Sequence, residues 1–219
     1  MIRAFLLDIE GTTTPIDFVT RTLFPYARAR LPEFLALPLE VIGEDLSDLA
    51  NERAQDTAYQ GPDEPLPYLE FLMDQDRKST ALKSIQGKIW QRGYESGEIK
   101  GEVYDDVIPA IERWRGNGAK VYIYSSGSVL AQKLLFGHLK TGSILSLIDG
   151  HYDTLAGGKK EPTSYEKIAA DIGVGASEVM FLSDAIAEIE AASHAGMQTV
   201  LVDRTGQNPG ALSTFDRIA

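Results

Sequence analysis

The sequence predicts an α/β protein with a doubly wound parallel-sheet core and an all-helical cap inserted after the first strand. Ala4–Leu7 is a short apolar run of the length and type expected for a buried strand. A long helical segment follows, and from Val107 onward helices and strands alternate, as in a parallel sheet covered on both faces. We therefore assign residues 1–15 and 104–219 to the α/β core and residues 16–103 to the cap.

The cap is predicted from three stretches that space their apolar residues at helical intervals. These stretches are Thr20 to Arg30, Leu39 to Glu52 and Leu82 to Glu95. Gly61-Pro62 and Pro65 to Pro67 interrupt the pattern, and we interpret both as loops. No convincing strand is found in this segment, which indicates that the inserted domain is entirely helical.

The remainder of the core is predicted from alternating helical and extended patterns. Helices are expected over Ile108–Arg115, Val129–Phe136, Tyr165–Ile172 and Ala185–His194. Strands are expected over Lys120–Tyr124, Val179–Leu182 and Gln198–Val202. Strands separated by helices require right-handed crossovers, so these strands should lie parallel to one another and to the first strand.

Composition excludes several classes of function. The 219 residues carry 21 Lys and Arg against 32 Asp and Glu, a formal net charge of −11. Such a surface repels phosphate backbones and no basic cluster offsets it, so we expect no nucleic-acid partner. The absence of cysteine excludes disulfides, thiolate metal sites and a cysteine nucleophile. No apolar run has the length of a signal peptide or a membrane span, so we expect a cytoplasmic protein without a membrane partner. We also expect a monomer.

Two acidic residues follow the first predicted strand. Asp8 and Glu10 stand where that strand runs into a loop broken by Gly11, at the edge where open α/β sheets bind ligands. Residues i and i+2 of an extended chain point the same way, so both carboxylates can reach one small site. Such a pair can bind Mg²⁺ or perform nucleophilic and acid–base chemistry. The alternative is an acidic turn that happens to end a strand.

Hydroxyl groups follow the predicted strand that ends at Tyr124. Ser125 and Ser126 precede the next helix, where hydroxyls and backbone donors can hold a phosphate. Capping of that helix is the alternative explanation for any one serine. The serines lack a G-x-S-x-G arrangement, so a serine nucleophile is not indicated.

A lysine and a further acid complete the set of polar residues. Lys159 lies in the glycine-rich loop 157–162, which lacks Walker A spacing, and can neutralise a phosphate; most lysines are simply solvated. Asp184 ends another apolar strand, and Glu188 follows four residues later. Asp184 could cap the next helix. As a third carboxylate at the same edge, however, it would repel Asp8 and Glu10 unless a cation such as Mg²⁺ were present.

The histidines and tryptophans are predicted to be structural. His138, His151 and His194 lie far apart and lack the spacing of metal ligands. Trp90 and Trp114 occupy helical positions and are expected in the protein core rather than against a ligand.

Together these motifs resemble the haloacid dehalogenase superfamily of aspartate-nucleophile phosphatases. The matching residues are Asp8 with Glu10, Ser125, a lysine of the 159–160 pair, and Asp184 with Glu188. Most of those phosphatases have aspartate two residues after the nucleophile, whereas this chain has Glu10. The run Asp-Ile-Glu-Gly-Thr-Thr-Thr-Pro-Ile looks like the enolase-phosphatase branch, also called acireductone synthase. That resemblance continues through residues 23–26, 86–90, 121–128 and 132–138 and covers nearly the whole chain.

The resemblance implies a bifunctional step of methionine salvage. The substrate would be 2,3-diketo-5-methylthiopentyl-1-phosphate, which is enolised and then dephosphorylated to the acireductone 1,2-dihydroxy-3-keto-5-methylthiopentene. It implies Mg²⁺ on Asp8, the Glu10 carbonyl oxygen and Asp184. Asp8 would be the nucleophile and Glu10 the acid–base group of phosphate transfer.

The resemblance also implies substrate contacts. Ser125, Ser126 and Lys159 would bind the phosphate or the neighbouring carbonyl, Lys159 being preferred to Lys160 because it stands two residues before Glu161. The base of the enolisation stays open between Glu10 and Lys159.

Apolar residues near the start of the cap could contact the methylthio tail or belong to the cap core; these are Ile16, Phe18 and Phe24.

Three alternative functions can be distinguished from this one by assay. They are a generic small-metabolite phosphatase, a metal-free dehalogenase and a catalytically inactive binding module.

Overall fold

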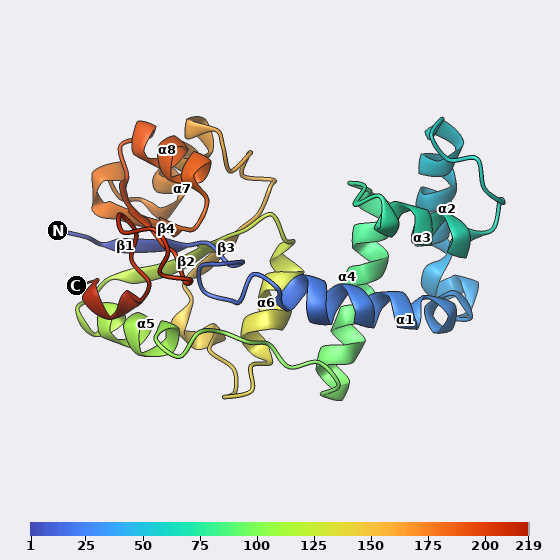
Figure 1. Ribbon diagram of the computed structural model, residues 1–219, viewed down its shortest axis with the longest axis horizontal. Coiled ribbons are helices and arrows are strands. Elements are labelled where there is room, and N and C mark those ends of the chain that lie inside the picture. Colours follow the sequence, from blue (N-terminus) through green and yellow to red (C-terminus); the bar gives the residue numbers. More distant parts are fainter. Residues whose placement is uncertain (219) are drawn as a thin grey trace. The chain divides into compact units, whose positions relative to one another are not determined.

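The computed structural model describes residues 1–218, which divide into two compact units (Figure 1). The α/β unit contains Met1–Val19 together with the chain from Lys100 onward, and the helical unit contains Thr20–Ile99. The predicted segment limits, 15/16 and 103/104, lie within four residues of these boundaries. Among the described residues, no helix has both the length and the apolar character needed to cross a membrane.

Within residues 1–218, the α/β unit contains one five-stranded sheet in the order β3-β2-β1-β4-β5. The strands are β1 (Ala4–Leu7), β2 (Lys120–Tyr124), β3 (Gly150–Tyr152), β4 (Val179–Ser183) and β5 (Gln198–Leu201). Every neighbouring pair is parallel, and β1 lies between β2 and β4. The predicted doubly wound α/β fold is confirmed, and the carboxyl ends of β1, β2 and β4 meet at one edge.

Helices cover both faces of this sheet (Figure 1). The α-helices described in this unit are α5 (Val107–Gly116), α6 (Val129–Gly137), α7 (Pro162–Ile172) and α8 (Ile186–His194). Single 3₁₀ turns occupy Leu145–Leu147, Ala176–Glu178 and Phe215–Arg217.

Alternate residues of β1 bury their side chains on opposite faces of the sheet. Phe5 stacks on Trp114 of α5, with ring centroids 4.0 Å apart and planes 9° from parallel. Leu6 belongs to a cluster on the other face that includes Tyr165 of α7 and Ala192 of α8. Burial on both faces explains why the strand is apolar at every position, and Trp114 is a core residue, as predicted.

The helical unit contains α1 (Phe24–Leu35), α2 (Leu39–Gln55), α3 (Pro65–Asp74) and α4 (Thr80–Ser96), preceded by a π-helical turn over Val19–Leu23. Helix α4 supplies the most buried side chains of this unit. Its Trp90 is buried and donates a hydrogen bond from Nε1 to the Leu23 carbonyl oxygen at 2.8 Å. Trp90 is therefore structural, as predicted.

The structure corrects three predictions of local structure. Pro65 to Pro67 is the first turn of α3 rather than a loop, because a proline at the start of a helix has no amide hydrogen to leave unpaired. The helix expected from Thr20 begins at Phe24, after the π-helical turn. Strand β3 was not predicted, because Gly150–Tyr152 is too short to show an alternating pattern.

Candidate active site

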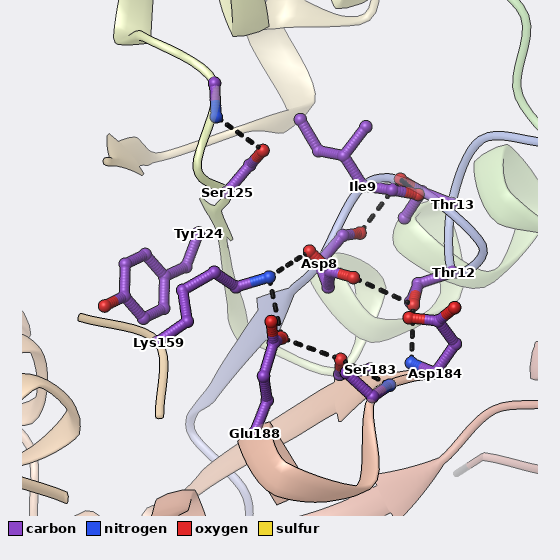
Figure 2. Close-up of polar contacts among 12 residues, drawn as sticks. Asp8, Ile9, Thr12, Thr13, Tyr124, Ser125, Lys159, Ser183, Asp184 and Glu188 are labelled. Carbon is purple, nitrogen blue, oxygen red and sulfur yellow. Dashed lines mark hydrogen bonds and ion pairs between the residues drawn. The ribbon is translucent and has the colours of Figure 1, made fainter. Parts of the chain in front are cut away.

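Asp8 stands at the carboxyl end of the central strand β1. Its amide donates to the Leu182 carbonyl oxygen at 3.0 Å, which continues the pairing of β1 with β4. The side chain is 5% exposed, and its Oδ1 forms an ion pair with the Lys159 ammonium group. The hydroxyl of Thr12 donates to Asp8 Oδ2 at 3.4 Å (Figure 2). Each carboxylate oxygen of Asp8 therefore contacts a side chain of the protein, Lys159 at Oδ1 and Thr12 at Oδ2.

Lys159 lies between two carboxylates (Figure 2). Besides Asp8, its Nζ contacts Glu188 Oε2 at 2.7 Å, and Glu188 in turn accepts a hydrogen bond from Ser183 Oγ at 2.9 Å. The backbone of the lysine is fixed as well, because the Tyr165 hydroxyl donates to the Lys159 carbonyl oxygen at 2.6 Å. Lys160 is exposed. Of the two neighbouring lysines, Lys159 is thus the one that reaches Asp8.

The loop before Lys159 depends on glycine. Gly157 has φ +135°, a conformation that residues with a side chain rarely adopt, and a Cβ there would lie 2.1 Å from Ser164 Oγ. The Ser164 hydroxyl also donates to the Gly158 carbonyl oxygen at 2.8 Å. Gly157 therefore allows the loop before Lys159 to pack tightly against Ser164 of α7.

Asp184 packs over the loop that follows Asp8. A Cβ at Gly11, which has φ +75°, would lie 2.2 Å from Asp184 Oδ2, so the carboxylate needs a glycine at this position. The Asp184 amide donates to Thr12 Oγ1 at 3.0 Å, and this hydroxyl links Asp184 to Asp8 (Figure 2). Asp184 does not cap α8, whose N-cap residue is Ala185. The structure therefore brings the two aspartates to one loop.

The electrostatics of the site reflect crowded negative charge. Burial raises the pKa of Asp8 to about 7, with a smaller opposing effect from Lys159 and further increases from Glu188 and Glu10. Burial and the charge of Glu188 also raise the pKa of Asp184. Burial disfavours the ammonium of Lys159, but Asp8 and Glu188 outweigh this effect and raise its pKa. Lys159 therefore stays protonated, whereas burial and the neighbouring carboxylates disfavour the charged forms of Asp8 and Asp184.

The remaining predicted residues lie at the same edge of the sheet. Glu10 is half-buried, and its charge acts on both Asp8 and Asp184. Ser125 is buried, and its Oγ accepts a hydrogen bond from the Gly127 amide at 3.1 Å. Ser126 is exposed. The capping role considered for these serines belongs to Ser128, whose Oγ accepts from the Ala131 amide.

A cavity of about 420 Å³ adjoins this site within the α/β unit. It is bounded by Gly11, Ile16, Asp184 and Arg204, among others. Ile16 is 65% exposed, whereas Phe18 is buried. In the helical unit, Phe24 stacks near Trp90, with ring centroids 6.3 Å apart. Of the apolar residues considered for the substrate tail, Phe18 is thus a core residue.

Several residues of the site were not singled out from the sequence. Thr12 and Ser183 stand near the predicted acids in the sequence. Their hydroxyl groups beside those acids were the feature that could have marked them as hydrogen-bonding partners. Glu188 was noted by its spacing from Asp184 and by the family resemblance, but no role was assigned to it. Arg204 contacts the carbonyl oxygen of Thr12 although the two residues are 192 positions apart, and no sequence motif predicts this contact.

His151 lies outside this set of residues. Burial lowers the pKa of His151 to about 4, and its ring contacts Gln132.

Comparison with known proteins identifies the family. Residues 2–196 match the model of the haloacid dehalogenase-like hydrolases. The enolase-phosphatase E1 of Synechococcus elongatus is 50% identical over 214 residues, covering 94% of this chain and 90% of the relative. The Unknown transcript 4 protein of Saccharomyces cerevisiae has a crystal structure that superposes with a TM-score of 0.81 at 36% identity, covering 100% of both chains.

A more distant structure shows the fold with ligands. A haloacid dehalogenase family enzyme from Bacteroides thetaiotaomicron, determined with magnesium and inorganic phosphate, is 13% identical with a TM-score of 0.54, covering 95% of this chain and 98% of that one. The fold and the sequence matches confirm the resemblance that the motifs predict. The chain belongs to the enolase-phosphatase E1 family of haloacid dehalogenase-like hydrolases.

Proposed function

We propose that this chain converts 2,3-diketo-5-methylthiopentyl-1-phosphate to 1,2-dihydroxy-3-keto-5-methylthiopentene and phosphate, by enolisation and then phosphate release, as the methionine-salvage step of its family. The observation that supports this most directly is the Asp8 carboxylate. It is buried at the end of the central strand, with Lys159 on one oxygen and Thr12 on the other.

Asp8 is the nucleophile in this proposal. One of its oxygens attacks phosphorus in line, the bond from phosphorus to the ester oxygen breaks, and an aspartyl-phosphate forms. Lys159 offsets the charge of the phosphate while it also orients Asp8. Glu10 protonates the departing ester oxygen. It then accepts a proton from the water that attacks the phosphorus and releases Asp8.

The residues present fit a divalent cation that binds hard oxygen donors. The carboxylates of Asp8 and Asp184 and the carbonyl oxygen of Glu10 would hold Mg²⁺, which prefers such oxygen ligands. Among residues 1–218, no three His, Cys, Asp or Glu side chains are grouped as a metal site. Burial, with a smaller contribution from the charges of Glu188 and Glu10, raises the pKa of both Asp8 and Asp184, and a cation would favour the charged forms of these carboxylates.

When bound, Mg²⁺ would supply charge neutralisation at the phosphate and Lewis-acid polarisation of the substrate carbonyl. For the protein's own part in enolisation, the structure favours Glu10 as the base. Lys159 is held between two carboxylates that raise its pKa, so it keeps its proton. Glu10 removes the proton from the carbon beside the carbonyl, and the carbonyl oxygen receives the electrons as an enolate.

Substrate binding is assigned to the residues around this centre. Ser125 and Ser126 hold phosphate oxygens or the neighbouring carbonyl, and Ile16, which is exposed beside Asp184 in the same cavity, contacts the methylthio tail. Residues 16–103 act as the cap of a core formed by residues 1–15 and 104–219. We further propose that the protein works as a cytoplasmic monomer and needs neither a nucleic acid nor a membrane.

The test is a direct assay on the diketo phosphate with and without Mg²⁺. Enol absorbance and inorganic phosphate are followed in the same sample. We expect absorbance to rise before phosphate and both signals to require Mg²⁺. Phosphate release from simple esters with no enol signal from the diketone would instead identify a generic phosphatase. Chloride release from a haloacid would identify a dehalogenase, and tight binding without turnover an inactive binding module.

A further inference from the structure

Arg204 is a buried arginine that contacts the loop following Asp8. Its side chain is 8% exposed and stands shortly after β5. Nε and Nη2 donate to the Thr12 carbonyl oxygen at 2.9 Å and 2.7 Å. Nη1 donates to Asp106 Oδ2 at 2.7 Å and to the Ser213 carbonyl oxygen at 3.2 Å. Two N–H donors of the guanidinium group thus bind a single carbonyl oxygen in the loop that follows Asp8.

The guanidinium group is also held by aromatic rings. Its central carbon lies 4.4 Å from the ring centroid of Tyr104 and 4.3 Å from that of Phe215. Stacking on rings and donating two hydrogen bonds from neighbouring nitrogens to one oxygen both suit a planar group, which arginine has and lysine lacks. Asp106 balances the buried charge and also accepts a hydrogen bond from the Phe215 amide at 2.6 Å. The position and plane of Arg204 are therefore fixed from several sides.

Thr12 transmits this restraint to the proposed catalytic centre. Its hydroxyl donates to Asp8 Oδ2 and accepts from the Asp184 amide. We propose that Arg204 is a positioning residue: by clamping the Thr12 carbonyl it holds the Thr12 hydroxyl between Asp8 and Asp184, and so sets the orientation of both carboxylates. This inference rests on the proposed function for its effect on turnover, whereas the clamp itself is a property of the folded chain.

Arg113 provides a matched control. Its Nη2 donates to the carbonyl oxygens of Phe215 and Ile218 at 2.8 Å and 3.1 Å, so it also anchors the C-terminal segment through two arginine–carbonyl bonds. None of these bonds involves Thr12. If Arg204 served only to anchor the C-terminal segment, Arg204→Lys and Arg113→Lys would have similar effects.

The kinetic test compares Arg204→Lys with Arg113→Lys on the diketo phosphate. Because a displacement of about 1 Å can cost on the order of 100-fold in rate, we expect kcat to fall about 100-fold in Arg204→Lys, with KM little changed. Arg113→Lys should retain the wild-type kcat. Guanidinium ion at millimolar concentration should partly restore kcat to Arg204→Ala, since it can occupy the slot between the two rings, and ammonium ion should not.

A second measurement does not depend on turnover. Amide hydrogen exchange of Gly11 to Thr14, measured without Mg²⁺, should be faster in Arg204→Lys than in the wild type and unchanged in Arg113→Lys. Wild-type kcat in Arg204→Lys, or equal exchange in the two variants, would overturn the positioning role. A wild-type protein inactive on the diketo phosphate would overturn the proposed function instead, and hydrogen exchange would still decide whether Arg204 clamps the loop.

Discussion

Each unit of the molecule buries an aspartate against a lysine, and the two pairs differ in how their charge is balanced. In the helical unit, Asp45 of α2 contacts Lys88 of α4 at 2.6 Å and accepts a hydrogen bond from Ser84 at 2.7 Å. The Asp45 side chain is 4% exposed, but that of Lys88 is 41% exposed and remains hydrated. One acid thus meets one base and one hydroxyl, an arrangement that joins two helices.

In the α/β unit, the lysine itself is buried and the acids outnumber it. Lys159 is 11% exposed and contacts both Asp8 and Glu188, and the charge of Glu10 also acts on Asp8. Burial is the largest cause of the raised pKa of Asp8, and the charges of Glu188 and Glu10 raise it further, so folding places Asp8 where its charged form is disfavoured. The comparison teaches that an excess of buried acids, rather than a buried ion pair as such, distinguishes the candidate active site.

The largest effect that would sharpen this comparison is expected for Asp8→Asn. The amide is nearly the same size as the carboxylate but cannot act as the nucleophile. We expect phosphate release to fall by at least about 10⁴-fold, as is typical when a nucleophile is removed. Phosphate release is measured under saturating substrate, with circular dichroism to show that the variant is folded. Retained turnover would remove Asp8 from the mechanism.

Glu10→Gln tests the acid–base role of the second carboxylate. General acid–base catalysis typically contributes about 10²- to 10⁴-fold, so we expect a loss of that size in phosphate release. If Glu10 is also the enolisation base, the appearance of the enol should slow as well. Both signals are followed in one stopped-flow experiment. Undiminished turnover would exclude the acid–base role of Glu10. Loss of phosphate release with a normal rate of enol formation would mean that another residue is the base of the enolisation.

Asp184→Asn tests the proposed cation. Removing groups that merely support metal ligands already costs about 10- to 100-fold in affinity, so the loss of a direct ligand should cost at least as much. Mg²⁺ binding is measured by calorimetric titration. Asp203→Asn is the control. Asp203 borders the same cavity, but its carboxylate accepts hydrogen bonds from the amides of Thr205 and Asn208 and is not a proposed ligand, so Mg²⁺ affinity should not change. An unchanged titration for Asp184→Asn would remove it from the ligand set.

The parts of this architecture that sequence could predict are those governed by local pattern. Apolar runs such as Val179–Leu182 identify buried strands, and in a parallel sheet their carboxyl ends meet at one edge. That rule alone placed Asp8, Asp184 and the Ser125 loop together, and the structure confirms the fold that it assumes. The chemical roles of these residues follow from the family resemblance and remain predictions.

The parts that sequence could not predict depend on long-range contacts or on ambiguous signals. Arg204 and Thr12 follow β5 and β1, which belong to one sheet. The sequence around either residue contains no pattern that predicts contact with the other. The prolines at the start of α3 are equally compatible with a loop and with a first helical turn, and packing of that helix decides. Likewise, no local pattern shows that Lys159 reaches Asp8 and Glu188 while Lys160 is exposed.

The smallest expected effect concerns the pair in the helical unit. Asp45→Asn keeps the shape of the side chain but removes its charge, so it weakens the contacts to Lys88 and Ser84 without stranding a buried lysine, since Lys88 is hydrated. We expect the free energy of unfolding to fall by about 1.5–3 kcal/mol, the range for loss of a hydrogen bond to a charged group, with kcat unchanged. Chemical denaturation and the phosphate assay measure the two quantities. A large loss of kcat in a folded Asp45→Asn protein would contradict the distinction drawn between the two pairs, because the balanced pair would then also serve the reaction.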